Sequence, residues 1–378
     1  MKKVFKANLP LGFKASAVAC GLKKSGKLDL ALLYSELPAL ASAQFTTNSI
    51  IAAPLIISKK HLRTAKRFQA ILVNSGNANC FTGKTGLSDA QATVEFTARE
   101  LGLKKNSVLI NSTGIIGRRL NISKIKLAMP KLVRGLTVEG INAAKNAILT
   151  TDTFSKEVTI DLQIGKCPVK ICAIAKGAGM VAPHMATMLC FILTDARIGQ
   201  NVLDKALKSA VADSFNCITV DGCMSTNDTV MMLANGASGN KMILKGKDLQ
   251  NFSTALNTVC LDLAKMVVCD AEGATKFIQI DVTQARNDAE AKGVALEIAN
   301  SLLFKTAVFG ENPNFGRVAS AVGASGFKIK ETQLQIKLGS LKGKTVKLSV
   351  KLLRGQGKAR VFTSDLTPEY IKINAEYN

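Results

Sequence analysis

Short runs in which apolar and polar residues alternate recur along this 378-residue chain, and they limit the folds open to it. Residues 158–164 form one such run, and after Gly165-Lys166 a second run begins at Cys167. Two alternating runs joined by a short polar turn predict an antiparallel β-hairpin with one buried face. Residues 334–338 and 346–350 alternate in the same way and predict two further strands near the C-terminus.

Other segments have helical spacing. Residues 88–101 begin with a capping-box pattern at Ser88 and stop at Gly102, and apolar residues recur at helical intervals over 202–215. Residues 189–193 are apolar without alternation, which favours a strand buried on both faces. Strands and helices mixed along one chain predict an α+β or α/β layered fold, in which mixed sheets are covered by helices.

The composition is typical of a soluble globular protein, with 47% hydrophobic and 20% charged residues. No apolar run approaches the roughly 18 residues of a membrane span, and the N-terminal region lacks the continuous apolar segment of a secretion signal. We therefore expect a cytoplasmic protein with no membrane attachment. The nine cysteines include no Cys-x-x-Cys pair and lie among apolar neighbours, which favours buried free thiols over disulfides or metal ligands.

The formal charge of +23 raises the possibility of a nucleic-acid partner. The lysines are scattered rather than clustered, only 5% of residues are aromatic, and no nucleic-acid-binding module is recognisable. We therefore expect no nucleic-acid partner. The charge excess fits better with a lysine-rich composition that steers anionic small substrates.

The chain has only two histidines. They leave few candidates for a Ser-His-Asp or Cys-His catalytic arrangement and are too few for a His-rich metal site. His61 lies among lysines and is expected at the surface, and His184 is expected to have a structural role in a loop. A hydroxyl can instead be activated by the α-amine of its own residue when that residue begins a chain. On its own, Ala186-Thr187 is one candidate among many, and Thr187 is more simply an ordinary strand residue.

Of two glycine-containing segments, one is a candidate for binding an anion through its backbone N–H groups. Residues 176–180 have the wrong glycine spacing for a Walker loop or a dinucleotide fingerprint. Residues 111–117 follow the apolar run 108–110 and are expected at the exit of a strand. Their backbone N–H groups could bind an oxyanion, although a simple turn is the favoured explanation when the segment is taken alone.

Several segments nevertheless resemble, in order, the motifs of one known family. The run KGAGMVAPHMATML spans 176–189, and the accompanying motifs are NSGNAN (74–79), STGIIG (112–117), TTDTF (150–154), SFNCITVDG (214–222), STNDT (225–229), DAEGATK (270–276) and GENPNFGR (310–317). In this order, between Gly12 and Asn374, they resemble the ornithine acetyltransferase (glutamate N-acetyltransferase) family. The resemblance implies the layered fold of these enzymes and of the DmpA-like aminopeptidases.

The resemblance implies a precursor that breaks its own Ala186-Thr187 bond, giving an α chain, 1–186, and a β chain, 187–378. The freed Thr187 hydroxyl would take acetyl from N2-acetylornithine and pass it to glutamate, a ping-pong reaction of arginine biosynthesis. The family further implies an α2β2 heterotetramer and no metal or organic cofactor. The sequence leaves open whether acetyl-CoA is a further acetyl donor.

The same motifs imply the site residues. Thr113 and Gly114 correspond to the oxyanion hole, and the substrate-binding positions are Thr150 or Thr151, Lys176, Thr187, Glu272 and Asn374. A lysine can hold the α-carboxylate of either amino acid, and a glutamate can hold the ammonium group of ornithine. Alternatively, Lys176 and Glu272 form a structural ion pair with each other.

The chain departs from the family pattern at a few positions. His184 replaces a smaller or amide residue, Cys223-Met224 replaces Asp-Thr, and Phe315 replaces a tryptophan. Family members usually continue to a Ser or Thr shortly beyond the position of Asn374, so one binding group is expected to be missing. A rival hypothesis is a Thr-nucleophile aminopeptidase or amidohydrolase of related fold that uses water as acceptor. The motifs STNDT and GENPNFGR, together with the substrate-site lysine and glutamate, favour the transferase.

Overall fold

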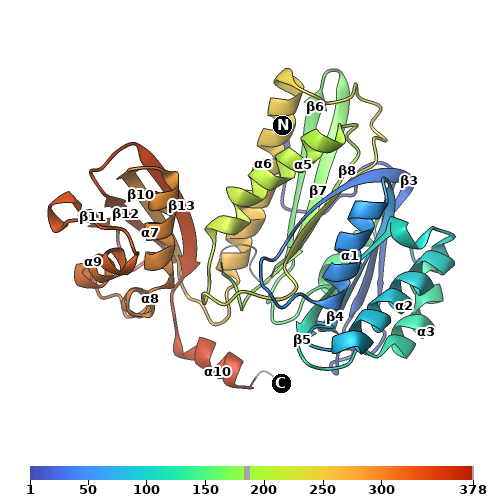
Figure 1. Ribbon diagram of the computed structural model, residues 1–378, viewed down its shortest axis with the longest axis horizontal. Helices are drawn as coiled ribbons and strands as arrows, with labels where there is room; N and C mark the ends of the chain where they lie inside the picture. Colours follow the sequence, from blue (N-terminus) through green and yellow to red (C-terminus); the bar gives the residue numbers. More distant parts are fainter. Residues whose placement is uncertain (183–187, 377–378) are drawn as a thin grey trace. The chain divides into compact units, whose positions relative to one another are not determined.

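The protein divides into two compact units (Figure 1). The computed structural model describes residues 1–182 and 188–376. Unit 1 comprises Met1–Gly177, Thr187–Asp213 and Ser225–Leu263, and unit 2 comprises Ala178–Ala186, Ser214–Met224 and Ala264–Asn378. Each of the two chains expected from cleavage, 1–186 and 187–378, therefore contributes segments to both units.

Unit 1 is built on a mixed nine-stranded sheet, whose order is β1-β6-β7-β8-β9-β3-β4-β5 with β2 paired to β3. The pairs β4·β5 and β8·β9 are parallel, and the other pairs are antiparallel. The strands are β1 (Lys2–Val4), β2 (Phe13–Val18), β3 (Leu30–Phe45), β4 (Phe68–Asn77), β5 (Val108–Ile115), β6 (Lys156–Ile164), β7 (Cys167–Lys176), β8 (Leu189–Thr194) and β9 (Thr229–Ala234).

The long strand β3 divides this sheet into two halves. Its residues 30–34 pair with β4, and its residues 40–45 pair with β9. Pro38 lies at the break between them, where its missing N–H cannot continue the ladder. Apolar side chains from both halves, such as Leu33 of β3 and Phe191 of β8, belong to one core cluster. The two halves therefore pack face to face.

Helices cover the outer faces of unit 1 (Figure 1). Helices α1 to α3 share a second core cluster with β3, β4 and β5, whereas α4 joins the cluster between the two halves. Helix α5 contacts β3. The helical segments are α1 (Ala53–Thr64), α2 (Gly83–Leu101), α3 (Ile122–Arg134), α4 (Ile141–Ala147), α5 (Gln200–Ala212) and the short 3₁₀ turn η1 (Lys105–Ser107).

Unit 2 has a four-stranded sheet in the order β11-β12-β10-β13. Along β12 every second residue is buried, and the buried face packs against α7 and its neighbours in one core cluster. The elements are η2 (Phe215–Cys217), β10 (Phe277–Ala285), α7 (Asp288–Asn300), α8 (Leu302–Phe309), α9 (Phe315–Ala324), η3 (Glu331–Gln333), β11 (Gln335–Leu338), β12 (Thr345–Lys351), β13 (Gly357–Ser364) and α10 (Pro368–Glu376).

Helix α6 (Gly246–Cys269) begins in unit 1 and ends in unit 2. Over 18 residues its mean hydropathy reaches 1.3, so by length and composition alone it passes for a membrane span. Half of that window is buried inside the protein, as in the core helix of a soluble domain.

The main elements predicted from the sequence are confirmed. The hairpin is β6 and β7, with Ile164 opposite Cys167 across the Gly165 turn. Residues 189–193 lie in β8, which is buried along its whole length. The helix expected over 202–215 is α5, and the C-terminal runs are β11 and β12. These mixed sheets covered by helices confirm the layered α+β fold.

The predicted start of the helix at Ser88 is wrong, because α2 begins at Gly83. The side chain of Asn79 donates to the carbonyl of Gly86, and Thr82 donates to Asn79, so local hydrogen bonds fix an earlier first turn. The predicted end is confirmed, since Gly102 terminates the helix with a φ of 66°.

The cysteine prediction is confirmed only in part. All nine thiols are free. Cys20 and Cys167 are half-buried, and Cys223 and Cys269 are exposed, so apolar sequence neighbours did not ensure burial. Cys269 is the last residue of α6, where the helix ends beside solvent. The buried thiols are Cys80, Cys172, Cys190, Cys217 and Cys260.

Candidate active site

A buried charged cluster lies at the end of β7 in unit 1. The Lys176 ammonium donates to Thr150 Oγ1 at 2.7 Å and lies 3.6 Å from Asp152 Oδ2. Asp152 Oδ1 accepts from Lys156 Nζ at 2.7 Å and from the backbone N–H of Gly177 at 2.6 Å. Thr151, the alternative to Thr150, follows it and is half-buried. The structure therefore brings together Thr150 and Lys176, two of the predicted substrate-binding residues.

The two lysines decide the charge of Asp152. Burial alone would raise the pKa of this carboxyl, but the charges of Lys176 and Lys156 outweigh burial and hold the pKa well below its usual range. The cluster thus has two cations and one anion, with the side chains of all three almost inaccessible to solvent. Its excess positive charge suits a carboxylate ligand.

Lys23 adds a further cation that the sequence reasoning missed. Buried Asp29 accepts from the backbone N–H groups of Cys20, Leu22 and Lys23, which fixes the loop that carries this lysine. Lys23 Nζ donates to Leu28 O at 2.7 Å and to Ala147 O at 3.3 Å. Burial lowers the pKa of Lys23 to about 8, in part opposed by the charge of Asp29.

The predicted oxyanion-hole residues lie on β5, which continues through Ile115. The expectation that this segment follows a strand exit is therefore wrong, because parallel pairing with β4 extends to Gly114 opposite Gly76. Gly114 has a φ of 130°, and a Cβ here would lie 2.4 Å from the carbonyl carbon of Gly76. Only glycine fits this position. The preceding Thr113 is buried.

In unit 2, the structure brings together Glu272 and Asn374. Asn374 Nδ2 donates to Glu272 Oε2 at 2.9 Å, and the Glu272 N–H donates to Ala178 O. A Cβ on Gly179 would lie 2.2 Å from Glu272 Oε2. Glycine at 179 is therefore what allows the Glu272 carboxylate to lie against the backbone.

Asp221 organises the neighbouring backbone of unit 2 and was also missed. Its carboxylate accepts from the N–H groups of Met180, Val181 and Cys223. The Tyr370 hydroxyl donates to Asp221 Oδ2 at 3.2 Å, and burial followed by the Asp221 charge raises the pKa of this phenol. Cys223, which departs from the family pattern, thus still donates its backbone N–H to Asp221.

The predicted nucleophile and cleavage site, Thr187 and Ala186, lie outside the described residues, as does His184. The described chain resumes at Met188, whose N–H donates to Asp228 Oδ1 at 3.1 Å. The roles of all the predicted site residues remain predictions. Within residues 1–182 and 188–376, no group of three His, Cys, Asp or Glu side chains could hold a metal ion.

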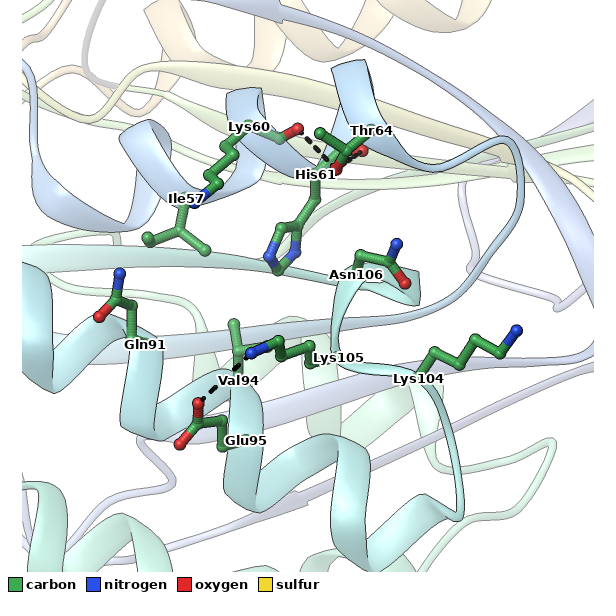
Figure 2. Close-up of a pocket in the computed structure, with 10 residues that line it drawn as sticks. All are labelled: Ile57, Lys60, His61, Thr64, Gln91, Val94, Glu95, Lys104, Lys105 and Asn106. Carbon is green, nitrogen blue, oxygen red and sulfur yellow. Dashed lines mark hydrogen bonds and ion pairs between the residues drawn. The ribbon is translucent and has the colours of Figure 1, made fainter.

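The prediction that His61 is a surface residue is wrong. Its ring is buried, with Nδ1 2.8 Å from the carbonyl oxygen of Val108, and burial lowers its pKa. Figure 2 shows the ring pointing from α1 into a cavity of about 440 Å³ that α2 also lines. Lys60, Lys104 and Lys105 also line this cavity.

Comparisons with known proteins identify the family. A family model described as the ArgJ family matches residues 14–342. The arginine biosynthesis bifunctional protein ArgJ of Geobacter sulfurreducens is 42% identical over 388 residues, covering 97% of this chain and 98% of the relative. The corresponding protein ArgJ 1 of Nostoc sp. is 39% identical over 398 residues, covering 97% and 96%. The chain belongs to the ArgJ family.

One solved structure similar to this ArgJ-family chain is ornithine acetyltransferase complexed with ornithine from Mycobacterium tuberculosis. It is 36% identical and covers 48% of this chain and 97% of that chain, with a TM-score of 0.45. Family membership, which rests on the full-length relatives, confirms the resemblance drawn from the ordered motifs. It also confirms the prediction of an acyltransferase enzyme of arginine biosynthesis.

Proposed function

We propose that the chain transfers acetyl from N2-acetylornithine to glutamate through an acetyl ester on Thr187. The observation that carries this function is the match to the ArgJ family over most of the chain, with ArgJ relatives aligned over 97% of its length. The buried cations beside Thr150 support it, because both amino acids carry an α-carboxylate.

The reaction begins with cleavage of the chain. The Thr187 hydroxyl attacks the Ala186 carbonyl carbon, the peptide C–N bond breaks, and water hydrolyses the resulting ester. This leaves a carboxylate on Ala186 and a free α-amine on Thr187. That amine, with an ordinary pKa of about 8, then removes the proton of the hydroxyl next to it.

Acetyl transfer follows as two half-reactions. The Thr187 oxygen attacks the acetyl carbonyl of N2-acetylornithine, and the α-amine delivers its proton to the departing ornithine nitrogen. The amino group of glutamate then attacks the acetyl ester, and N-acetylglutamate leaves as the threonine hydroxyl re-forms. Thr113 and Gly114 donate to the oxyanion in each tetrahedral intermediate.

Substrate recognition is divided by charge. Lys176 holds the α-carboxylate together with Thr150, Glu272 holds the ornithine ammonium group, and Asn374 orients Glu272. We propose acetyl-CoA as a second acetyl donor, which the word bifunctional in the names of the relatives supports. We also propose a cytoplasmic α2β2 heterotetramer that needs no metal or organic cofactor.

The test follows both steps in one protein. Mass spectrometry should find two fragments that meet between residues 186 and 187. Labelled N2-acetylornithine should pass its acetyl group to glutamate, and labelled acetyl-CoA should acetylate glutamate as well. Thr187→Ala should leave one uncut chain without transferase activity. A cut or active Thr187→Ala protein refutes the proposal, and failure with acetyl-CoA alone refutes only the second donor.

The rival Thr-nucleophile aminopeptidase or amidohydrolase is not favoured by the family match. It predicts that ornithine is released equally fast with or without glutamate. The transferase predicts that glutamate accelerates steady-state release, because the acetyl ester needs an acceptor amine.

A further inference from the structure

The segment Ser225–Asp228, which precedes β9, contacts both the strand of the predicted oxyanion hole and the start of β8. The Asn227 side-chain amide donates to Ser112 O and to Ala78 O, each at 2.8 Å. The Ser112 carbonyl and the Thr113 N–H belong to one planar peptide unit. Asn227 therefore orients the peptide that carries the predicted oxyanion-hole donor.

The next residue holds the start of β8. Asp228 Oδ1 accepts from the Met188 N–H at 3.1 Å, and the Asp228 side chain is buried. The Met188 N–H belongs to the peptide unit that links Met188 to Thr187. Asp228 therefore fixes the backbone N–H of Met188, the residue that follows the predicted nucleophile in sequence.

Hydrogen bonds hold this segment rigidly in unit 1. The Thr46 N–H donates to Asp228 O at 2.9 Å, and the Thr46 hydroxyl donates to Ser225 O at 2.8 Å. Thr226 donates to Asn227 Oδ1 at 2.6 Å, which fixes the orientation of the Asn227 amide. Directly afterwards, Thr229 begins β9 opposite Leu189 of β8.

From this geometry we propose that Asn227 and Asp228 are positioning residues, which together fix Met188, the neighbour of the predicted nucleophile, relative to Ser112, the neighbour of the predicted oxyanion hole. This inference rests on the proposed function. A misplacement of about 1 Å between reacting groups can cost about 100-fold in rate, so a rigid two-residue link is a means of keeping the rate high.

Asp228 acts here as a hydrogen-bond acceptor in a buried position that disfavours its charged form. Its Oδ2 is buried and has no hydrogen-bond partner within residues 1–182 and 188–376. Burial raises the pKa of Asp228 well above its usual range, although the Met188 N–H and the Lys176 charge act in the opposite direction. An asparagine, which keeps the acceptor oxygen without the ionisable group, should therefore replace Asp228.

Two residues of the same unit serve as matched controls. Asp195, directly after the other end of β8, is a buried carboxylate that accepts from the N–H groups of Lys170 and Leu11. Asn240 is a buried amide that accepts from the Arg197 N–H and donates to Arg197 O. Among the described residues, neither control side chain hydrogen-bonds to Ser112 or Met188.

The experiment compares Asp228→Ala, Asp228→Asn and Asn227→Ala with Asp195→Asn and Asn240→Ala. Circular dichroism and urea unfolding check that each variant folds, and mass spectrometry follows chain cleavage. Steady-state transfer from N2-acetylornithine to glutamate gives kcat and KM. We expect Asp228→Ala and Asn227→Ala to lower the cleavage rate and kcat about 100-fold with little change in KM. Asp228→Asn and both controls should keep rates close to those of the parent.

Several results would overturn the inference. These are parent-like rates in folded Asp228→Ala and Asn227→Ala, equal losses in the control variants, or an Asp228→Asn protein as slow as Asp228→Ala. If the alanine variants do not fold, Asp228→Glu takes their place. It moves the acceptor by one methylene and should be slow where Asp228→Asn is fast, so equal rates would contradict the inference. A parent protein that neither cleaves nor transfers acetyl refutes the proposed function instead.

Discussion

Unit 1 holds two buried aspartates whose environments shift their acidity in opposite directions. Asp152 lies beside Lys156 and Lys176, and its pKa is well below the usual range, although burial opposes ionisation. Asp228 accepts the Met188 N–H and leaves its second oxygen without a partner among the described residues, and burial raises its pKa.

Both carboxyl groups are buried, so the presence or absence of charged partners decides which way the pKa moves. At Asp152 the negative charge neutralises part of a lysine cluster and leaves a net positive site suited to a carboxylate. At Asp228 burial disfavours the charged form of a side chain that accepts a backbone N–H from Met188.

Removal of the Asp152 carboxylate should have the largest effect on stability. Asp152→Ala leaves the ammonium groups of Lys156 and Lys176 buried without their shared anion, which should lower the free energy of unfolding by about 3–5 kcal/mol. Urea unfolding at neutral pH measures this loss. Asp228→Asn, measured alongside, should not lose stability at this pH. Equal losses in the two variants would contradict the contrast.

Removal of one lysine should separate binding from stability. We expect Lys176→Met to lower kcat/KM for N2-acetylornithine about 50-fold, chiefly through KM, because a charged hydrogen bond to the carboxylate is lost. Lys156→Met is the matched control, since Lys156 also pairs with Asp152 but is not a predicted substrate ligand. If Lys156→Met raises KM as much as Lys176→Met, the assignment of Lys176 is wrong.

The two aspartates should give opposite pH dependences of stability. The contribution of Asp152 is present above the ordinary carboxyl pKa of about 4 and is lost as pH falls through its lowered folded value. Asp228 reduces stability as pH rises from about 4 through its raised value. Relative to the parent, Asp152→Asn should thus lose more stability at pH 7 than at about pH 3, and Asp228→Asn should gain stability as pH rises above about 4. Urea unfolding across this range measures both, and parallel curves would refute the prediction.

His61 should give the smallest effect. Its ring contacts the carbonyl of Val108 through Nδ1, so His61→Leu should cost about 1 kcal/mol of stability at neutral pH. Acetyl transfer should be unchanged, because the cavity beside His61 has no assigned role in the reaction. Urea unfolding and the transfer assay provide the measurements. A large loss of kcat in His61→Leu would show that this cavity matters for catalysis.

Local patterns predicted the regular elements well, because alternation and helical spacing report directly on which faces are buried. The hairpin around Gly165, buried β8 and helix α5 all follow from such patterns. Errors arose where distant residues decide the outcome. His61 has lysine neighbours in sequence but packs on Val108, and β5 extends past its apolar run because Gly76 of β4 accommodates Gly114.

The candidate site shows the same limit. Lys176, Thr150 and Asn374 came from motif position, and the structure supplies partners for each. Asp152 and Asp228 stood inside quoted motifs without a role, since only the fold reveals that one meets two lysines and the other a backbone N–H. Nothing in the sequence distinguished Lys23 from the other lysines as a site residue, because Asp29 and Ala147 position it through tertiary contacts.

The most direct test of the central claim is to trap the acetyl ester. Processed protein is incubated with N2-acetylornithine in the absence of glutamate, quenched in acid and digested for mass spectrometry. We expect one acetyl group on the peptide that begins at Thr187, lost again when glutamate is added before the quench. An unbroken chain between residues 186 and 187 in fully active protein, or an acetyl group carried on another residue, would contradict it.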